Sequence, residues 1–202
     1  MSTPARRLRE PVLLTVFFIS GMSALIYQVA WQRLLFASFG VDVESITIIV
    51  STFMLGLGLG ALIGGKLADR FSDSLILLFA LSEAGIGCFG VLSPMLIPAV
   101  GDMFVQQSMP VIVIANFLLI LLPASFMGAT LPMLVAYLVQ RNGSVGVSIG
   151  TLYLSNTLGA ATGAIATATL LFLLLTLDQA IFVAAAGNFL AACTIYLQLR
   201  RG

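Results

Sequence analysis

The chain has 202 residues, of which 60% are apolar and only 8% are charged, and its formal net charge is +1. Soluble domains carry about 25% charged residues, so this composition predicts a membrane protein in contact with a lipid bilayer. The near-zero net charge gives no reason to expect a nucleic-acid partner. Histidine is absent and both cysteines lie in apolar stretches, so no metal centre, cofactor or disulfide framework is expected.

Six apolar stretches are long enough to cross a bilayer as helices, which takes about 20 residues each. They run near 11–36, 43–65, 74–99, 110–140, 146–176 and 179–198. The pattern predicts an all-α integral membrane bundle of six transmembrane helices, forming a single domain over residues 1–202. Small residues near Ala24 are typical of a secretory signal, but the apolar character continues to Trp31, which favours a permanent first helix.

The basic residues predict how these helices are oriented. Apart from Arg33, all of them flank the apolar stretches on one predicted side of the membrane: Arg6, Arg7, Arg9, Lys66, Arg70, Arg141, Arg200 and Arg201. Loops that carry Lys and Arg stay in the cytoplasm. We therefore expect a multi-pass protein of the inner membrane with both termini in the cytoplasm.

Arg33 lies near the far end of the first stretch, on the predicted outer side. Its long side chain is expected to reach the outer interface and to meet Asp42 or Glu44 in the following turn. The helical rise separates Arg33 from Glu83 by about 20 Å along the membrane normal, so these two are not expected to pair.

The second stretch carries Gly56, Gly60 and Gly64 at four-residue spacing. Small residues at this spacing form a face that a second helix backbone can approach closely, although glycine is also common in membrane helices generally. The spacing predicts that Gly60→Leu disrupts the bundle and that Gly60→Ala has a milder effect. At the inner end of this helix, Asp69 and Arg70 are expected to form an ion pair with the next helix.

The third stretch contains an acidic residue close to the middle of the membrane. Glu83 lies nine residues into the predicted helix, which corresponds to about 14 Å from the cytoplasmic end. A carboxylate is costly to ionise at this depth, and intramembrane acids commonly mark functional sites. Two interpretations remain open: a proton or cation site that faces the bundle interior, or a neutral acid that is hydrogen-bonded across a helix interface.

The fourth stretch is longer than one perpendicular crossing requires. Its 31 residues correspond to about 46 Å of helix, while splitting it at Pro123 would leave two pieces too short to cross well. A single tilted helix with a kink at Pro123 or Pro132 is therefore expected. The carbonyl groups freed by the kink need partners, which Ser125 and Thr130 are expected to supply.

The fifth stretch repeats the glycine spacing of the second, with Gly159 and Gly163 four residues apart. If the chain consists of two sets of three helices, the fifth helix is the counterpart of the second. Three-helix repeats build each half of a major facilitator transporter. The sequence thus indicates a fold that resembles one half of such a transporter.

Polar side chains also occur inside several apolar stretches. They either line one polar cavity or form interhelical hydrogen bonds, each contributing about 0.6–2 kcal/mol. The members of this candidate cavity are Glu83, Gln28, Tyr27, Tyr153, Asn156 and Asn116. The same two interpretations apply to Asn188 in the last stretch.

Four motifs between residues 18 and 165 resemble a known family. They read SGMSALIYQVAWQR at 20–33, GLGLGA with GKLADR at 56–70, MGATLP at 127–132 and LYLSNTLGA at 152–160. Together they are similar to the membrane half of the spermidine-synthase-like membrane proteins. In that family, a major-facilitator-like helical region is usually fused to an aminopropyltransferase-type Rossmann domain. No such domain and no acidic catalytic pair are recognised in residues 1–202, and the GLGLG run at 56–60 lies inside an apolar stretch, so an enzyme is not expected.

Two classes of function follow. The first is a half-transporter that assembles as a homo-oligomer to move a small amine or another solute, since one six-helix half supplies only one wall of a transport pathway. The second is a non-catalytic membrane subunit that docks onto a larger complex or a separately encoded enzyme. The link to polyamines comes from the family resemblance alone.

Overall fold

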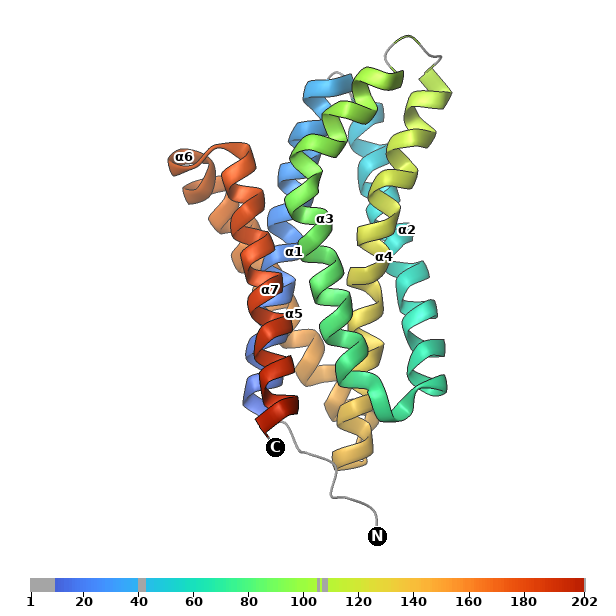
Figure 1. Cartoon of the computed structure of the whole chain (residues 1–202), viewed down its shortest axis with the longest axis vertical. Coiled ribbons are helices and arrows are strands. Elements are labelled where there is room, and N and C mark those ends of the chain that lie inside the picture. Colours follow the sequence, from blue (N-terminus) through green and yellow to red (C-terminus); the bar gives the residue numbers. More distant parts are fainter. Residues whose placement is uncertain (1–9, 40–42, 105, 107–108, 202) are drawn as a thin grey trace.

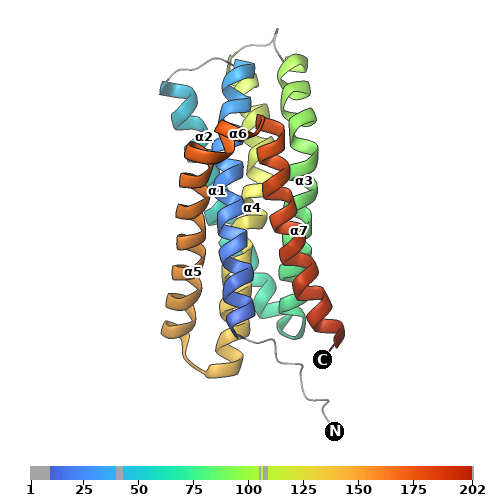
Figure 2. The same ribbon diagram turned by 90° about the vertical axis from the view of Figure 1, so that its left-hand side faces the viewer.

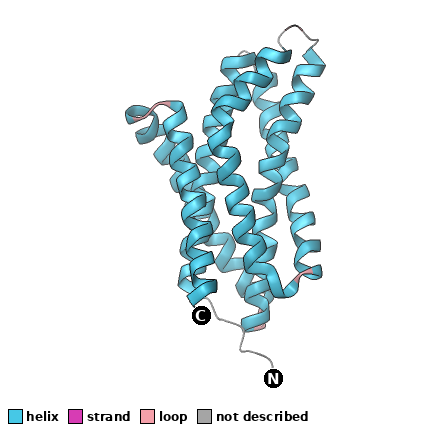
Figure 3. Ribbon diagram, in the orientation of Figure 1, coloured by secondary structure: helices cyan, strands magenta, loops and turns pink. Residues whose placement is uncertain are grey.

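The computed structural model describes residues 10–39, 43–104, 106 and 109–201, and this part of the chain is almost entirely helical (Figure 3). The elements in chain order are α1 (Glu10–Phe39), α2 (Val43–Arg70), the 3₁₀ turn η1 (Ser72–Ser74), α3 (Leu75–Phe104), α4 (Met109–Asn142), α5 (Val145–Ala166), the π-helical turn η2 (Thr167–Leu171), α6 (Phe172–Leu174) and α7 (Leu177–Arg201).

In the described part of the chain, six helical segments are long and apolar enough to cross a membrane, which confirms the predicted all-α fold with six candidate membrane spans. The start of α1 and the end of α7 lie at the same end of the bundle (Figure 1), as an even number of crossings requires. The predicted fifth helix is not uniform, because its last part is the π-helical turn η2 followed by the short α6.

The helices form three layers of two. In Figure 2, α1 and α4 occupy the centre, α2 and α5 lie on one side, and α3 and α7 lie on the other. Contacts between helices agree with this arrangement: α2 packs along α4, α1 along α5, and α3 along α7, while α3 also meets α4 and α1 also meets α7. The central pair therefore touches both outer layers.

Glycines bring α2 and α4 into backbone contact. A Cβ on Gly60 would overlap the backbone of Ser125, and a Cβ on Gly64 would overlap that of Ala129. The α2 helix therefore approaches α4 through the face that carries the four-residue glycine spacing. Even one methyl group at Gly60 would collide with backbone, so Gly60→Ala is also expected to destabilise the bundle, and its smaller effect relative to Gly60→Leu stays a prediction.

The fourth helix is continuous from Met109 to Asn142 and contains both Pro123 and Pro132, as predicted. The partners of its polar side chains differ from the prediction. A proline frees the carbonyl four residues before it, which here means Leu119 and Gly128. Instead, Ser125 donates to the carbonyl of Leu121 at 2.7 Å, and Thr130 donates to that of Met127 at 2.7 Å. These hydroxyls satisfy themselves within their own helix.

Two apolar core clusters fill the bundle. Both clusters draw members from α1, α3 and α7, the first between positions 26–35, 86–97 and 181–185 and the second between positions 13–17, 76–80 and 191–195; α2 and α4 add to the first cluster, and α4 and α5 add to the second. Each of the three helices therefore contributes to both clusters and crosses a short gap between them. The polar residues Ser20 and Ser23 of α1, Glu83 of α3 and Asn188 of α7 lie in that gap.

Candidate functional site

Glu83 is the centre of a buried polar group of residues in the gap between the two core clusters. Its side chain is fully buried. The Ser20 hydroxyl on α1 donates a hydrogen bond to Glu83 Oε1 at 2.6 Å, and the Asn188 amide on α7 donates one to Oε2 at 2.8 Å. Both carboxyl oxygens are thus held by donors from two different helices, which fixes the orientation of the carboxyl group.

No basic side chain balances Glu83 among the residues that the structure describes. The Arg33 guanidinium lies 3.9 Å from the ring centroid of Phe172, so its nearest aromatic partner is on α6. Arg70 and Arg141 lie near Phe71 and Tyr137 at the other end of the bundle. A negative charge on Glu83 would therefore be buried without a cation, which is strongly unfavourable in an apolar interior.

Three further polar atoms beside Glu83 lack hydrogen-bond partners. They are Ser23 Oγ, Tyr27 Oη and Asn188 Oδ1. Leaving a buried polar atom unpaired costs about 1–3 kcal/mol. We define the Glu83 cluster as Ser20, Ser23, Tyr27, Glu83 and Asn188. It combines one carboxyl group, which can bind a proton, with unpaired hydroxyl and amide oxygens, which can accept hydrogen bonds or coordinate a cation.

Small residues allow these polar groups to enter the helix interfaces. A Cβ on Gly90 of α3 would collide with the Tyr27 hydroxyl, and a Cβ on Gly187 of α7 would collide with Ser23 Oγ. The two glycines therefore make room for side chains that come from α1. This is a specific use of glycine at a close approach, because any larger residue would displace a polar group of the cluster.

Polar contacts continue along the same face of α1 beyond the Glu83 cluster. The Trp31 indole stacks on Tyr27 with ring centroids 4.6 Å apart. Its Nε1 donates to Ser93 Oγ at 2.8 Å, and the Ser93 hydroxyl donates to the Gly90 carbonyl at 2.8 Å. From Ser20 to Trp31, the α1–α3 interface thus carries a polar or aromatic group on each turn.

The predicted single polar cavity is divided between several places in the structure. Of its six members, Glu83 and Tyr27 are buried on the side of α1 that faces α3. Asn156 of α5 lies against Gly21, and Gln28 follows Gly21 by seven residues and so shares its face of α1. Tyr153 is 61% exposed. The structure therefore does not bring these six residues together.

Asn116 lies in a different part of the bundle. It lines a small pocket together with residues of α1, α2 and α4, namely Leu35, Ile49, Thr52, Phe117 and Ile120. This position is well removed along α1 from Ser20, which contacts Glu83. Asn116 therefore belongs to neither of the two polar groups described above.

Ser20 and Ser23 were absent from the predicted site. A signal for them was present in the sequence, because Ser20, Ser23 and Tyr27 are spaced by three and four residues and so share one face of a helix. Asn188 was recognised as a polar membrane residue but was not assigned to Glu83. Sequence reasoning found the carboxyl group and one neighbour, and missed the side chains that hold it.

The two predicted groups of charged residues at the helix ends give different results. Asp42 lies outside the described residues, and the side chain of Glu44 is not described, so their pairing with Arg33 stays a prediction. The described part of the chain contains no ion pair of Asp69 or Arg70. Arg70 instead lies 5.7 Å from the centroid of the Phe71 ring. The predicted inner ion pair is therefore replaced by a cation–aromatic contact.

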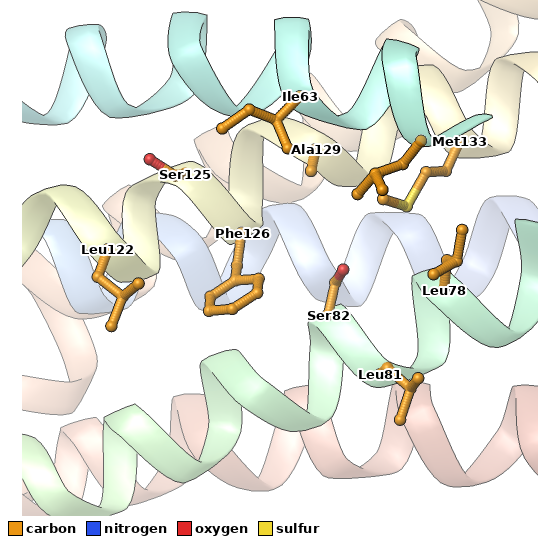
Figure 4. A pocket seen from close by; sticks show the side chains of 10 residues that line it. Ile63, Leu78, Leu81, Ser82, Leu122, Ser125, Phe126, Ala129 and Met133 are labelled. Carbon is orange, nitrogen blue, oxygen red and sulfur yellow. The ribbon is translucent and has the colours of Figure 1, made fainter. Parts of the chain in front are cut away.

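An apolar groove of about 320 Å³ runs between α2, α3 and α4 (Figure 4). Ser82 and Ser125 are its polar lining residues, and the Ser125 hydroxyl is already bonded within its own helix. The remaining lining is apolar and includes Ile63, Phe126 and Met133. This groove can hold hydrocarbon but offers no charged group to a small amine.

Comparisons of the chain with protein-family models, with curated proteins and with solved structures gave no match. The described residues form a six-helix bundle that holds a buried carboxyl group without a countercharge and has an outer layer of two helices, which the rest of the chain covers poorly.

Proposed function

We propose that the chain consists of two inverted three-helix repeats, α1–α3 and α4–α7, and works as one half of a transporter. The proposal predicts that the two repeats are related by a pseudo-two-fold axis in the membrane plane, as in each half of a major facilitator. Under this axis, α1 corresponds to α4, α2 to α5 and α3 to α7. The layered packing supports the proposal, because the exchange maps the α2–α4 contact onto α1–α5, the α3–α4 contact onto α1–α7, and the α3–α7 contact onto itself. In the described part of the chain, the α1–α3 contact has no comparable counterpart between α4 and α7.

The observation that carries the proposal is a set of glycine contacts that recurs in register. In the α2–α4 pair, close approaches join Gly60 to Ser125, Gly64 to Ala129, and Gly128 to Leu57. In the α1–α5 pair, the equivalent approaches join Gly159 to Phe18, Gly163 to Met22, and Gly21 to Asn156. The three contacts follow one another with the same spacing in both pairs.

One constant offset in residue number relates the α1 members of these contacts to the α4 members, and a second relates the α2 members to the α5 members. The α1 offset also relates Ile19, which lies near Gly187, to Phe126, which lies near Gly85. A general abundance of glycine does not produce matched partners. A duplicated three-helix unit does, because each repeat then inherits both the glycine and the backbone that it contacts.

The outer layer formed by α2 and α5 supports the half-transporter interpretation. The most apolar segment of α5 is only 17% buried within the chain and that of α2 is 28% buried, against 44–50% in the other four spans. These two helices flank the central pair (Figure 2). A second copy placed face to face would cover them and enclose a pathway whose walls are the central helices of both copies.

Cross-linking tests this arrangement. A two-fold axis along the membrane normal sets α2 of one copy opposite α5 of the other, so cysteines at the exposed positions Gly58 and Thr157 are expected to form a disulfide between copies after Cys88 and Cys193 are replaced by alanine. A control pair at Leu92 and Leu190, exposed on α3 and α7, is expected to remain uncross-linked. A monomer in native membranes, or cross-linking by the control pair alone, would contradict the proposal.

Transport is measured on the same protein in sealed proteoliposomes. Spermidine is the first solute to test, because the family resemblance points to small amines, and other solutes follow as a panel. We expect uptake that is lost when the Gly58–Thr157 disulfide locks the two copies together. A different membrane protein that co-purifies in fixed ratio, with no uptake of any solute, would favour the non-catalytic subunit instead.

A further inference from the structure

We propose that Glu83 is a reversible proton-binding site at the centre of the bundle. A carboxyl group that is fully buried, and that no described basic side chain accompanies, reaches charge balance in the membrane by taking up a proton. Ser20 and Asn188 hold its two oxygens at 2.6 and 2.8 Å. They bind the ionised carboxylate as donors, and the Ser20 hydroxyl can also accept a hydrogen bond from the protonated acid. The site thus suits both states.

The surroundings of Glu83 contain few groups that compete for a proton. On α1, the titratable neighbour is Tyr27, whose hydroxyl is buried without a partner. On α7, the facing group is Asn188, and on α4 it is Phe126, which lies beside Gly85. Cys88 is on α3 itself and is exposed. Among the described residues, Glu83 is therefore the acidic group around which proton uptake in the bundle interior is organised.

The proposed repeat supplies an internal comparison, and this step rests on the proposed function. The offsets that match the glycine contacts pair Ser20 with Met127, Glu83 with Ala185, and Asn188 with Ile86. All three counterparts are buried together in the first core cluster. The fold therefore fills the equivalent place with apolar side chains, and polar residues are not needed there for packing. The Glu83 cluster departs from the repeat in the way expected of a functional site.

Further hydroxyl groups follow Ser20 along α1 and extend the polar surroundings of Glu83. Ser23 Oγ and Tyr27 Oη have no hydrogen-bond partners in the described structure, and Ser93 lies one turn beyond Gly90, which contacts Tyr27. Each hydroxyl can donate and accept. The series extends for about 16 Å along α1 from Ser20 to Trp31.

Infrared difference spectroscopy of the purified full chain in lipid tests the proposal directly. Spectra at acidic and alkaline pH are expected to differ by the carbonyl band of one protonated carboxyl group that is insensitive to rapid solvent exchange. Glu83→Gln, which keeps the shape of the side chain, is expected to lose this band completely. Asp69→Asn, at an exposed helix end, is the matched control and is expected to keep it.

A second variant separates proton binding from a purely structural role. Ser20→Met, Glu83→Ala and Asn188→Ile together give this site the side chains of its proposed counterpart. We expect the triple variant to fold with unchanged or higher thermal stability and to show no buried carboxyl band, because the polar groups are removed as a set. Failure of the triple variant to fold would show that the cluster is needed for packing.

Two further outcomes would overturn the proposal. A Glu83 band that persists unchanged from acidic to alkaline pH would mean a permanently neutral acid. A band that disappears at fixed pH when choline is replaced by Na⁺ would identify a sodium site instead. None of these measurements depends on oligomerisation or transport. If the protein neither cross-links nor transports but still shows the pH-dependent band, the proposed function fails and proton binding by Glu83 holds.

Discussion

The close approach of α2 to α4 gives the sharpest test of the packing. Gly60→Ala places a methyl carbon 2.7 Å from the Ser125 carbonyl carbon and 2.9 Å from its Cα. Two carbon atoms pack at about 3.5–4.0 Å, so the helices must separate by about 1 Å at this point. Backbone on both sides leaves no flexible side chain to yield. Such overpacking lowers the free energy of unfolding by about 1–3 kcal/mol.

The same helix offers a matched control. Gly58 lies two residues away, and a Cβ there meets nothing within 4 Å. Gly58→Ala therefore has only the helical preference for alanine over glycine, which raises the free energy of unfolding by about 0.5–1 kcal/mol. The two substitutions are chemically identical and close in membrane depth, so the opposite signs expected for them within a single chain report the contact of α2 with the α4 backbone.

Reversible unfolding of the purified protein in mixed micelles, followed by circular dichroism, measures both variants against the natural chain. We expect Gly60→Ala to unfold at lower denaturant and Gly58→Ala at the same or higher denaturant. Equal stability of the two variants would refute the reasoning, since it would mean that α2 does not approach α4 through Gly60.

Three other substitutions test separate contacts, each by thermal unfolding in detergent. Ser93→Ala leaves the buried Trp31 indole N–H without an acceptor and is expected to cost about 1–3 kcal/mol, while Ser93→Thr retains most of the stability; equal loss in both would argue against the hydrogen bond. Phe172→Leu removes the ring 3.9 Å from Arg33 and is expected to cost about 0.5–2 kcal/mol, with a smaller loss once Arg33→Met is present, because Phe172 also packs against the first core cluster. Gly143 has a φ of 70°, so Gly143→Ala is expected to cost about 1–2 kcal/mol and Gly143→Asn less.

Much of the candidate site was within reach of the sequence. Glu83 is conspicuous because an acid inside an apolar stretch is rare, and its depth follows from counting residues. The three-and-four spacing of Ser20, Ser23 and Tyr27 places them on one helix face, which is also a local property. The choice of partner is different. Ser20 and Asn188 stand 63 and 105 residues from Glu83 in the chain, and no local pattern selects them among the other polar residues.

The division of the predicted polar cavity has the same cause. Tyr27 and Gln28 are adjacent in sequence but point about 100° apart around α1. One therefore faces α3 and the other shares the face of Gly21 toward α5. The sequence does not distinguish the environments of these polar residues, because transferring any of them into hydrocarbon is unfavourable. Only the packing of α1 between two layers separates them into different environments.

The sequence by itself determined the number of long apolar helices, because the need to satisfy every backbone group in lipid makes a run of about 20 apolar residues a helix regardless of its neighbours. The tertiary structure decided which faces meet. It brought the Gly60 face against backbone rather than lipid, turned the Ser125 and Thr130 hydroxyls to carbonyls of their own helix, and enclosed Glu83 between Ser20 and Asn188. These outcomes depend on the relative rotation of helices, which close packing sets through contacts between residues far apart in the chain.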